Sequence, residues 1–160
     1  MKPRRLSLEA QIRRMRAKWP EFRPGVIGST SISWMGPLRG FQMDYTVLVR
    51  WSVGQTPKAI VVSPQLRPRV GTAFIDIPHL ILDVENPEDS PLCLFDPEAG
   101  EWNDTLSVAD TILPWASEWL HNYELWHLDG VWRGPNAPGP ISIGDALRLR
   151  KECLHGEKTD

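Results

Sequence analysis

The chain has 160 residues, of which 41% are hydrophobic and 24% are charged, a balance that excludes a disordered chain and is typical of one globular domain. The formal net charge is −2, so no global field attracts nucleic acid or an acidic membrane. No apolar run approaches the roughly 20 residues that span a bilayer, and the N-terminus has no signal-peptide pattern. We therefore expect a cytoplasmic protein in which residues 1–160 form a single domain that binds neither nucleic acid nor membrane.

The first predicted element is an amphipathic helix over residues 6–19. Ser7 can cap its N-terminus, and prolines follow its C-terminal end. Its apolar residues recur at spacings of four, three and four, which places them on one face: Leu8, Ile12, Met15 and Trp19. The arginines of this segment occupy the other faces.

A run of short strands follows, joined by short connections that favour an antiparallel meander. The pattern predicts a first strand over residues 26–34 with a turn at Gly36-Pro37, and a second over residues 44–53, where the period of two is clearest. A third strand is expected over residues 58–62. Residues 75–84 form a possible fourth strand, which Pro78 would place at an edge of the sheet or at a bulge.

Helices are predicted in the C-terminal half of the chain. Asn103 or Asp104 can cap a long helix that runs to about Leu128 and ends at Gly130. Pro114 falls inside this helix and is expected to kink it or to divide it in two. A last short helix is predicted over residues 141–154. Strands followed by helices indicate an α+β fold.

Cys93 is the main candidate for chemistry. It lies in an irregular, proline-rich segment over residues 85–104, and loops of this length tend to be functional. A cysteine beside leucines is either a small buried hydrophobic residue or a nucleophile held on a rigid loop. His79 is the nearest upstream histidine and is either a base for Cys93 or a structural residue. Asn86 is either an oxyanion donor or a turn residue before Pro87.

Other kinds of site find no support in the sequence. No cysteine or histidine spacing suggests zinc. No phosphate loop and no dinucleotide fingerprint is present. We therefore expect neither a metal nor a cofactor.

The sequence around Cys93 resembles that of the ubiquitin-conjugating (UBC) enzymes. Those enzymes carry a catalytic cysteine between aliphatic residues, followed shortly by a tryptophan and then by a helix. Here the run Leu92-Cys93-Leu94-Phe95 is followed by Trp102 and residues 103–108, and a proline-rich stretch over residues 63–68 follows the third strand.

The order of elements carries the same resemblance, which covers residues 6–133 and leaves residues 134–160 as a C-terminal extension. It implies a UBC-like α+β fold with an N-terminal helix, a four-stranded antiparallel meander, an active-site loop and C-terminal helices. The eukaryotic enzymes have a His-Pro-Asn tripeptide before the cysteine. Here Pro78-His79 stands fourteen residues upstream of Cys93 without an attached asparagine, so Asn86 is the candidate for the oxyanion-donor role.

The chain is most similar to the bacterial UBC-like proteins of CBASS anti-phage operons, which are encoded beside an oligonucleotide cyclase. They share a Pro-His pair like Pro78-His79, a Leu-Cys-Leu core around the cysteine, and a tryptophan-rich helix like residues 109–120. The resemblance implies that the Cys93 thiolate attacks an activated C-terminal carboxyl, holds it as a thioester and passes it to an amine or another thiol. It also implies the cyclase as the carried protein and an activating enzyme as a second partner.

Two other functions remain open. A catalytically inactive UBC-like module would keep the fold and only dock a partner. A cysteine hydrolase using Cys93 and His79 would cleave a conjugate instead of forming one, and it requires the two side chains to lie within hydrogen-bond reach.

Overall fold

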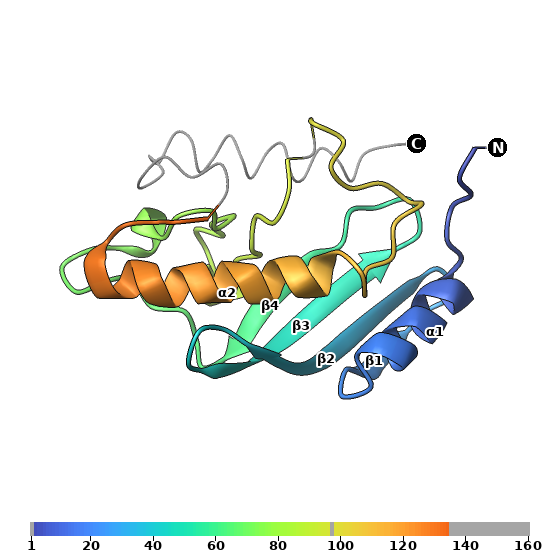
Figure 1. Ribbon diagram of the computed structural model, residues 1–160, viewed down its shortest axis with the longest axis horizontal. Coiled ribbons are helices and arrows are strands. Elements are labelled where there is room, and N and C mark those ends of the chain that lie inside the picture. Colours follow the sequence, from blue (N-terminus) through green and yellow to red (C-terminus); the bar gives the residue numbers. More distant parts are fainter. Residues whose placement is uncertain (1, 97, 135–160) are drawn as a thin grey trace.

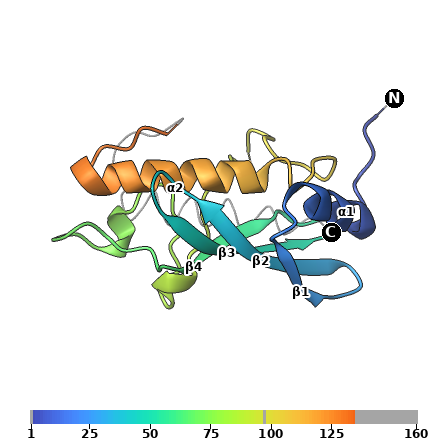
Figure 2. The same ribbon diagram turned by 60° about the horizontal axis from the view of Figure 1, so that its bottom comes forward.

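The computed structural model of the chain describes residues 2–96 and 98–134 (Figure 1). Within these ranges the fold is α+β: α2 (Ile112–Asp129) lies across one face of a four-stranded antiparallel sheet, and α1 (Leu8–Lys18) lies beside that sheet (Figures 1 and 2). The strands follow the chain order, β1 (Arg23–Ile27), β2 (Ser31–Arg39), β3 (Asp44–Ser52) and β4 (Lys58–Ser63). The predicted N-terminal helix and four-stranded meander are confirmed, whereas the helix predicted at 141–154 lies outside the described residues.

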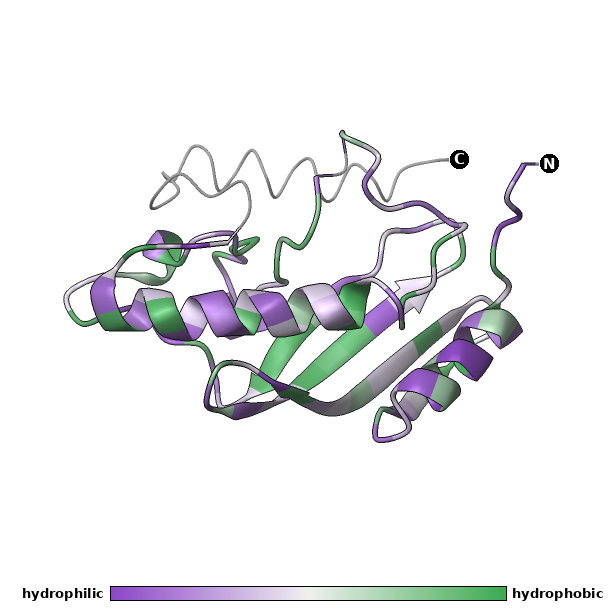
Figure 3. Cartoon of the chain, viewed as in Figure 1, coloured by the Kyte–Doolittle hydropathy of each residue, from purple (hydrophilic) through white to green (hydrophobic). Residues whose placement is uncertain are grey.

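α1 forms as its sequence pattern predicts. The Ser7 hydroxyl accepts a hydrogen bond from the backbone N–H of Ala10 at 3.1 Å, which caps the helix. Met15 is buried, and the other members of the apolar stripe pack against the core: Leu8, Ile12 and Trp19. Most of the other residues of α1 are coloured as hydrophilic in Figure 3.

The first two strands differ from the prediction of one strand over residues 26–34 with a turn at Gly36-Pro37. The chain turns earlier, after β1, and β2 then continues through Gly36 and Pro37 to Arg39. Gly36 serves close packing, because a Cβ there would lie 2.6 Å from the Phe22 ring. The pairing of β1 with β2 ends at Arg23 and Met35. Pro37 lies beyond this pair, so its missing N–H removes no hydrogen bond to β1.

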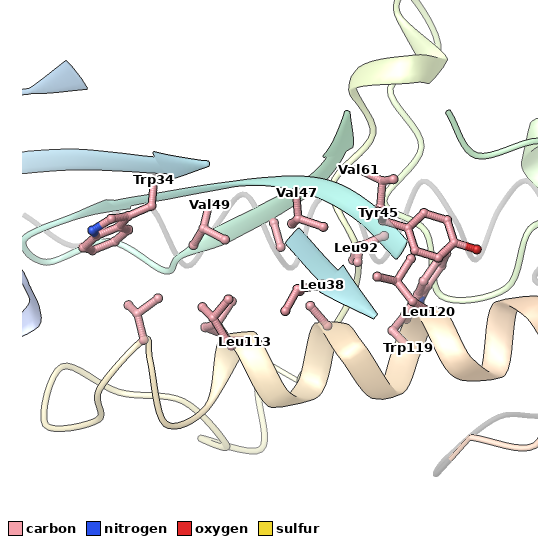
Figure 4. Close-up of a cluster of buried hydrophobic side chains, with 14 of the residues drawn as sticks. Trp34, Leu38, Tyr45, Val47, Val49, Val61, Leu92, Leu113, Trp119 and Leu120 are labelled. Atoms are coloured by element: carbon pink, nitrogen blue, oxygen red, sulfur yellow. The ribbon is translucent and has the colours of Figure 1, made fainter. Parts of the chain in front are cut away.

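The core lies between the sheet and α2. On β3 the alternation predicted from the sequence holds, because four side chains point inward and are buried: Tyr45, Val47, Val49 and Trp51. Leu113 and Leu120 of α2 meet them from the other side (Figure 4). Among residues 2–96 and 98–134, no helix combines the length and the apolar character needed to cross a membrane.

The possible fourth strand over residues 75–84 does not form. Phe74–Asp76 is a short 3₁₀ turn, and the rest of the segment makes a single bridge, between Leu80 and Leu92. Pro78 contributes no N–H to a ladder, whereas Ile77 and Leu80 are buried in the core. The sheet still has four strands, because the segment predicted as one strand over residues 26–34 contributes to two, β1 and β2.

The long helix starts later than predicted, at Ile112 and not near Asn103, although it ends at Gly130 as expected. Backbone groups of residues 106–109 bond to side chains of α1 and of the residue that follows it, so they are not available to an α-helix. The Gln11 amide donates to the Leu106 carbonyl at 3.0 Å and accepts from the Val108 N–H at 2.9 Å. The Trp19 indole N–H donates to the Ala109 carbonyl at 2.8 Å.

Pro114 consequently lies in the first turn of α2. A backbone N–H at this position has no intrahelical partner in any α-helix, so proline removes no bond there. The kink or break that we predicted at Pro114 is therefore wrong, and α2 runs as one helix to Asp129.

Candidate active site

The backbone of Cys93 is held by the pairing of two short segments, residues 79–81 and 91–93. The Cys93 N–H donates to the His79 carbonyl at 2.9 Å, and the Ile81 N–H donates to the Pro91 carbonyl at 2.8 Å. The Leu92 N–H donates to the Ala59 carbonyl of β4 at 2.9 Å, which ties the pair of segments to the sheet. Cys93 is thus fixed on both sides within a segment that the sequence predicted only as an irregular loop.

The side chain of Cys93 is half-buried and lines two hollows. The smaller one lies toward the residues that precede and begin β4, including Pro57 and Lys58. The larger one is an open groove of about 720 Å³ between the cysteine segment and α2. A groove of this size is in the range that binds small ligands or short peptide segments.

His79 positions Cys93 through its backbone. Its φ of 51° is in the left-handed region, which is uncommon for a residue with a side chain and marks a constrained position. The carbonyl of His79 accepts two hydrogen bonds at 2.9 Å, from the Cys93 N–H and from the Trp119 indole N–H. Because Trp119 belongs to α2 and is buried, this carbonyl joins the cysteine segment to the helix.

The imidazole of His79 faces the same groove and packs on the Trp132 ring, with centroids 5.5 Å apart. Its Nε2 atom is buried and has no hydrogen-bond partner among the described residues. Burial disfavours the charged form, so the pKa of His79 is lowered from its usual value. The ring is therefore neutral near pH 7, and it does not hold the Cys93 thiol through Nε2.

Asn86 lies elsewhere. It precedes the 3₁₀ turn Pro87–Asp89, is exposed, and is fixed by a bond from its backbone N–H to Asp83 Oδ1 at 3.1 Å. It lines neither of the hollows beside Cys93. The structure thus brings His79 and Cys93 together but does not add the Asn86 side chain to them.

Sequence reasoning missed the wall that α2 contributes to the groove. It treated the tryptophans of this helix mainly as core, which is correct for Trp126, but Trp119 also bonds to the His79 carbonyl. Asn122 lies three residues further along and faces the same groove. The available signal was a polar residue within an otherwise apolar helix face.

Carboxylates are among the residues that line the groove. Asp96, Glu101 and Glu118 contribute to its lining, and the Asp96 N–H donates to a Glu101 carboxylate oxygen at 2.9 Å. Aromatic rings also line it, with Trp115 against Phe95 at a centroid distance of 6.2 Å. A lining of this composition favours the approach of a cation such as an amine.

Fold and site together describe an α+β protein that presents one cysteine, fixed by its backbone, at a groove under a tryptophan-rich helix. Comparison with known families gives the class: residues 11–140 match the family described as Type II CBASS E2 protein. The chain therefore belongs to this family of bacterial UBC-like proteins, and the resemblance to CBASS proteins is confirmed. A search of curated proteins finds no match.

Proposed function

We propose that this protein is a thioester carrier of a CBASS anti-phage system, with Cys93 as its nucleophile. The observation that carries the proposal is the position of Cys93, whose backbone is bonded to His79 and whose side chain opens onto the groove under α2. Covalent catalysis depends on presenting the sulfur at a fixed angle. Membership of the E2 family supports an E2-like role in CBASS.

The reaction is an acyl transfer in two steps. The Cys93 thiolate attacks the carbonyl carbon of an activated C-terminal carboxyl, and the activating group leaves. An acceptor amine then attacks the thioester, the C–S bond breaks, and an amide forms. The carboxylates that line the groove suit an amine as the acceptor, because they attract its cationic form.

His79 and Asn86 have proposed supporting roles. The His79 carbonyl positions Cys93, and its imidazole, which lines the same groove in the neutral form, is a proposed proton acceptor. Asn86, which the sequence indicated as the oxyanion donor, would reach the thioester only if its loop moved toward Cys93.

Two protein partners are proposed. The CBASS oligonucleotide cyclase is the carried protein, as the resemblance to bacterial relatives implies. An activating enzyme would meet α1, where Arg13 and Arg16 are exposed. Arg14 and Lys18 are engaged instead in ion pairs with Asp110, so they hold α1 to the segment before α2.

The test is the intact mass of wild type and Cys93→Ala, each purified after co-expression with the neighbouring cyclase. The proposal predicts an adduct on wild type alone that hydroxylamine removes. A stable complex with no adduct on either protein would contradict it and favour a binding module. The hydrolase alternative has less support, because His79 Nε2 is buried and bonds to no group within residues 2–96 and 98–134, Cys93 included.

A further inference from the structure

Asn122 is a buried polar side chain whose burial no hydrogen bond explains. Only 7% of its surface is exposed. The other buried polar side chains of residues 2–96 and 98–134 have hydrogen bonds: Gln11 with Leu106 and Val108, Ser90 with Asp83, and Ser107 with Asp110. Within these ranges, no hydrogen bond joins the Asn122 side chain to a partner. Its amide is not one of the buried atoms that lack a partner, so the amide meets the groove that Asn122 lines and is free to bond to a group bound there.

The position of Asn122 relates it directly to Cys93. It lies three residues after Trp119 and therefore on the same side of α2. Trp119 donates to the His79 carbonyl, and the N–H of Cys93 donates to the same oxygen atom. Asn122 lines the groove that Cys93 and His79 also line. Its amide is thus presented from the helix toward the groove into which the thiol opens.

A second N–H group approaches the same place. A Cβ built on Gly134 would lie 2.9 Å from Asn122 Nδ2 and 2.5 Å from Trp132 Nε1. The two nitrogen atoms therefore lie close together beside Gly134, which also lines the groove and carries no side chain that would cover them. N–H donors that converge in a partly desolvated groove are the components of an oxyanion hole.

We propose that Asn122 Nδ2 donates a hydrogen bond to the oxyanion that forms during acyl transfer at Cys93, with Trp132 Nε1 as a neighbouring donor. This inference rests on the proposed thioester function. The amine nitrogen bonds to the thioester carbonyl carbon, and the π electron pair moves to the oxygen, where Asn122 stabilises it. When the carbonyl re-forms, the C–S bond breaks, and the Cys93 thiolate takes up the proton that the amine nitrogen loses.

The experiment uses the full chain and a chemical acyl donor, a glycyl thioester of 2-mercaptoethanesulfonate. Intact mass follows acylation of Cys93 and then its discharge onto free lysine. Asn122→Ala and Asn122→Leu remove the donor, and leucine also keeps the side-chain volume, so folding is retained even if the alanine variant is unstable. We expect both variants to slow acylation and discharge by about 10- to 100-fold, the size of effect that one oxyanion donor has in other enzymes.

Alkylation of Cys93 by iodoacetamide is the control reaction, because displacement at a saturated carbon forms no oxyanion. We expect its rate to be unchanged in both variants, and Asn86→Ala to slow acyl transfer less than Asn122→Ala. Wild-type rates of acyl transfer in the Asn122 variants would overturn the inference and leave the thioester function intact. Parallel slowing of alkylation, or a larger loss with Asn86→Ala, would also overturn it. Failure of wild type to take up any acyl group would overturn the proposed function itself.

Discussion

Replacing Trp119 with phenylalanine removes one hydrogen bond from the site and keeps most of the buried ring. The lost bond is the 2.9 Å contact from the indole N–H to the His79 carbonyl. Its net contribution is about 0.5–1.5 kcal/mol. The cavity left by the smaller ring costs about 1–2 kcal/mol, scaled from larger truncations of buried aromatic residues. We therefore expect the free energy of unfolding to fall by about 1.5–3.5 kcal/mol.

Trp126→Phe is the matched control, since Trp126 is equally buried on α2 and its indole bonds to no other described residue. It should lose only the cavity contribution, about 1–2 kcal/mol. Urea unfolding measures both losses. Discharge of the Cys93 thioester should slow in Trp119→Phe alone, because only this variant releases the His79 carbonyl from α2. Equal stability losses together with equal discharge rates would refute this account of Trp119.

Three further predictions concern α1 and its contacts. Gln11→Met leaves two buried backbone groups of residues 106–108 unpaired, so urea unfolding should show a loss of about 2–4 kcal/mol. Reversing the charge at Arg13 and Arg16 should weaken binding to an acidic activating partner, measured by calorimetry, without lowering the melting temperature; an equal loss of stability would show a structural role only. The hydrogen bond from Lys18 lowers the pKa of Asp110, so this carboxylate adds stability above pH 3.8 that is lost as the pH falls through its lower folded value. In acid titrations, Asp110→Asn should remove that pH dependence and, because the pair is exposed, cost less than about 1 kcal/mol at pH 7.

The fold could be predicted where one local pattern decides the structure. α1 and β3 form as expected because their apolar residues follow the helical and the strand period without interruption. Prediction failed where distant residues decide. Gly36 looks like a turn residue in the sequence, and only the approach of Phe22 shows why it lies inside β2. The start of α2 is displaced by hydrogen bonds from Gln11 and Trp19, about ninety positions away in the chain.

The candidate site could be predicted in part, for the same reason. Cys93 and His79 were both selected from the sequence, and they are neighbours because two short segments pair. The contact runs through the carbonyl of His79, a group that residue type cannot indicate. Asn122 and Trp132 reach the groove from α2 and from the segment after it, so no spacing relative to Cys93 connects them. Catalytic roles for Cys93, His79 and Asn86 stay predictions.

The most direct test of the central claim compares the adducts of wild type and Cys93→Ser, each co-expressed with the cyclase and measured by intact mass. A thioester carrier should give an adduct on wild type that a thiol reagent removes. The serine variant should give an oxygen ester of the same cargo that the thiol reagent leaves in place. An adduct that resists thiols on wild type, or one that persists in Cys93→Ala, would contradict the assignment of Cys93 as the carrier of the acyl group.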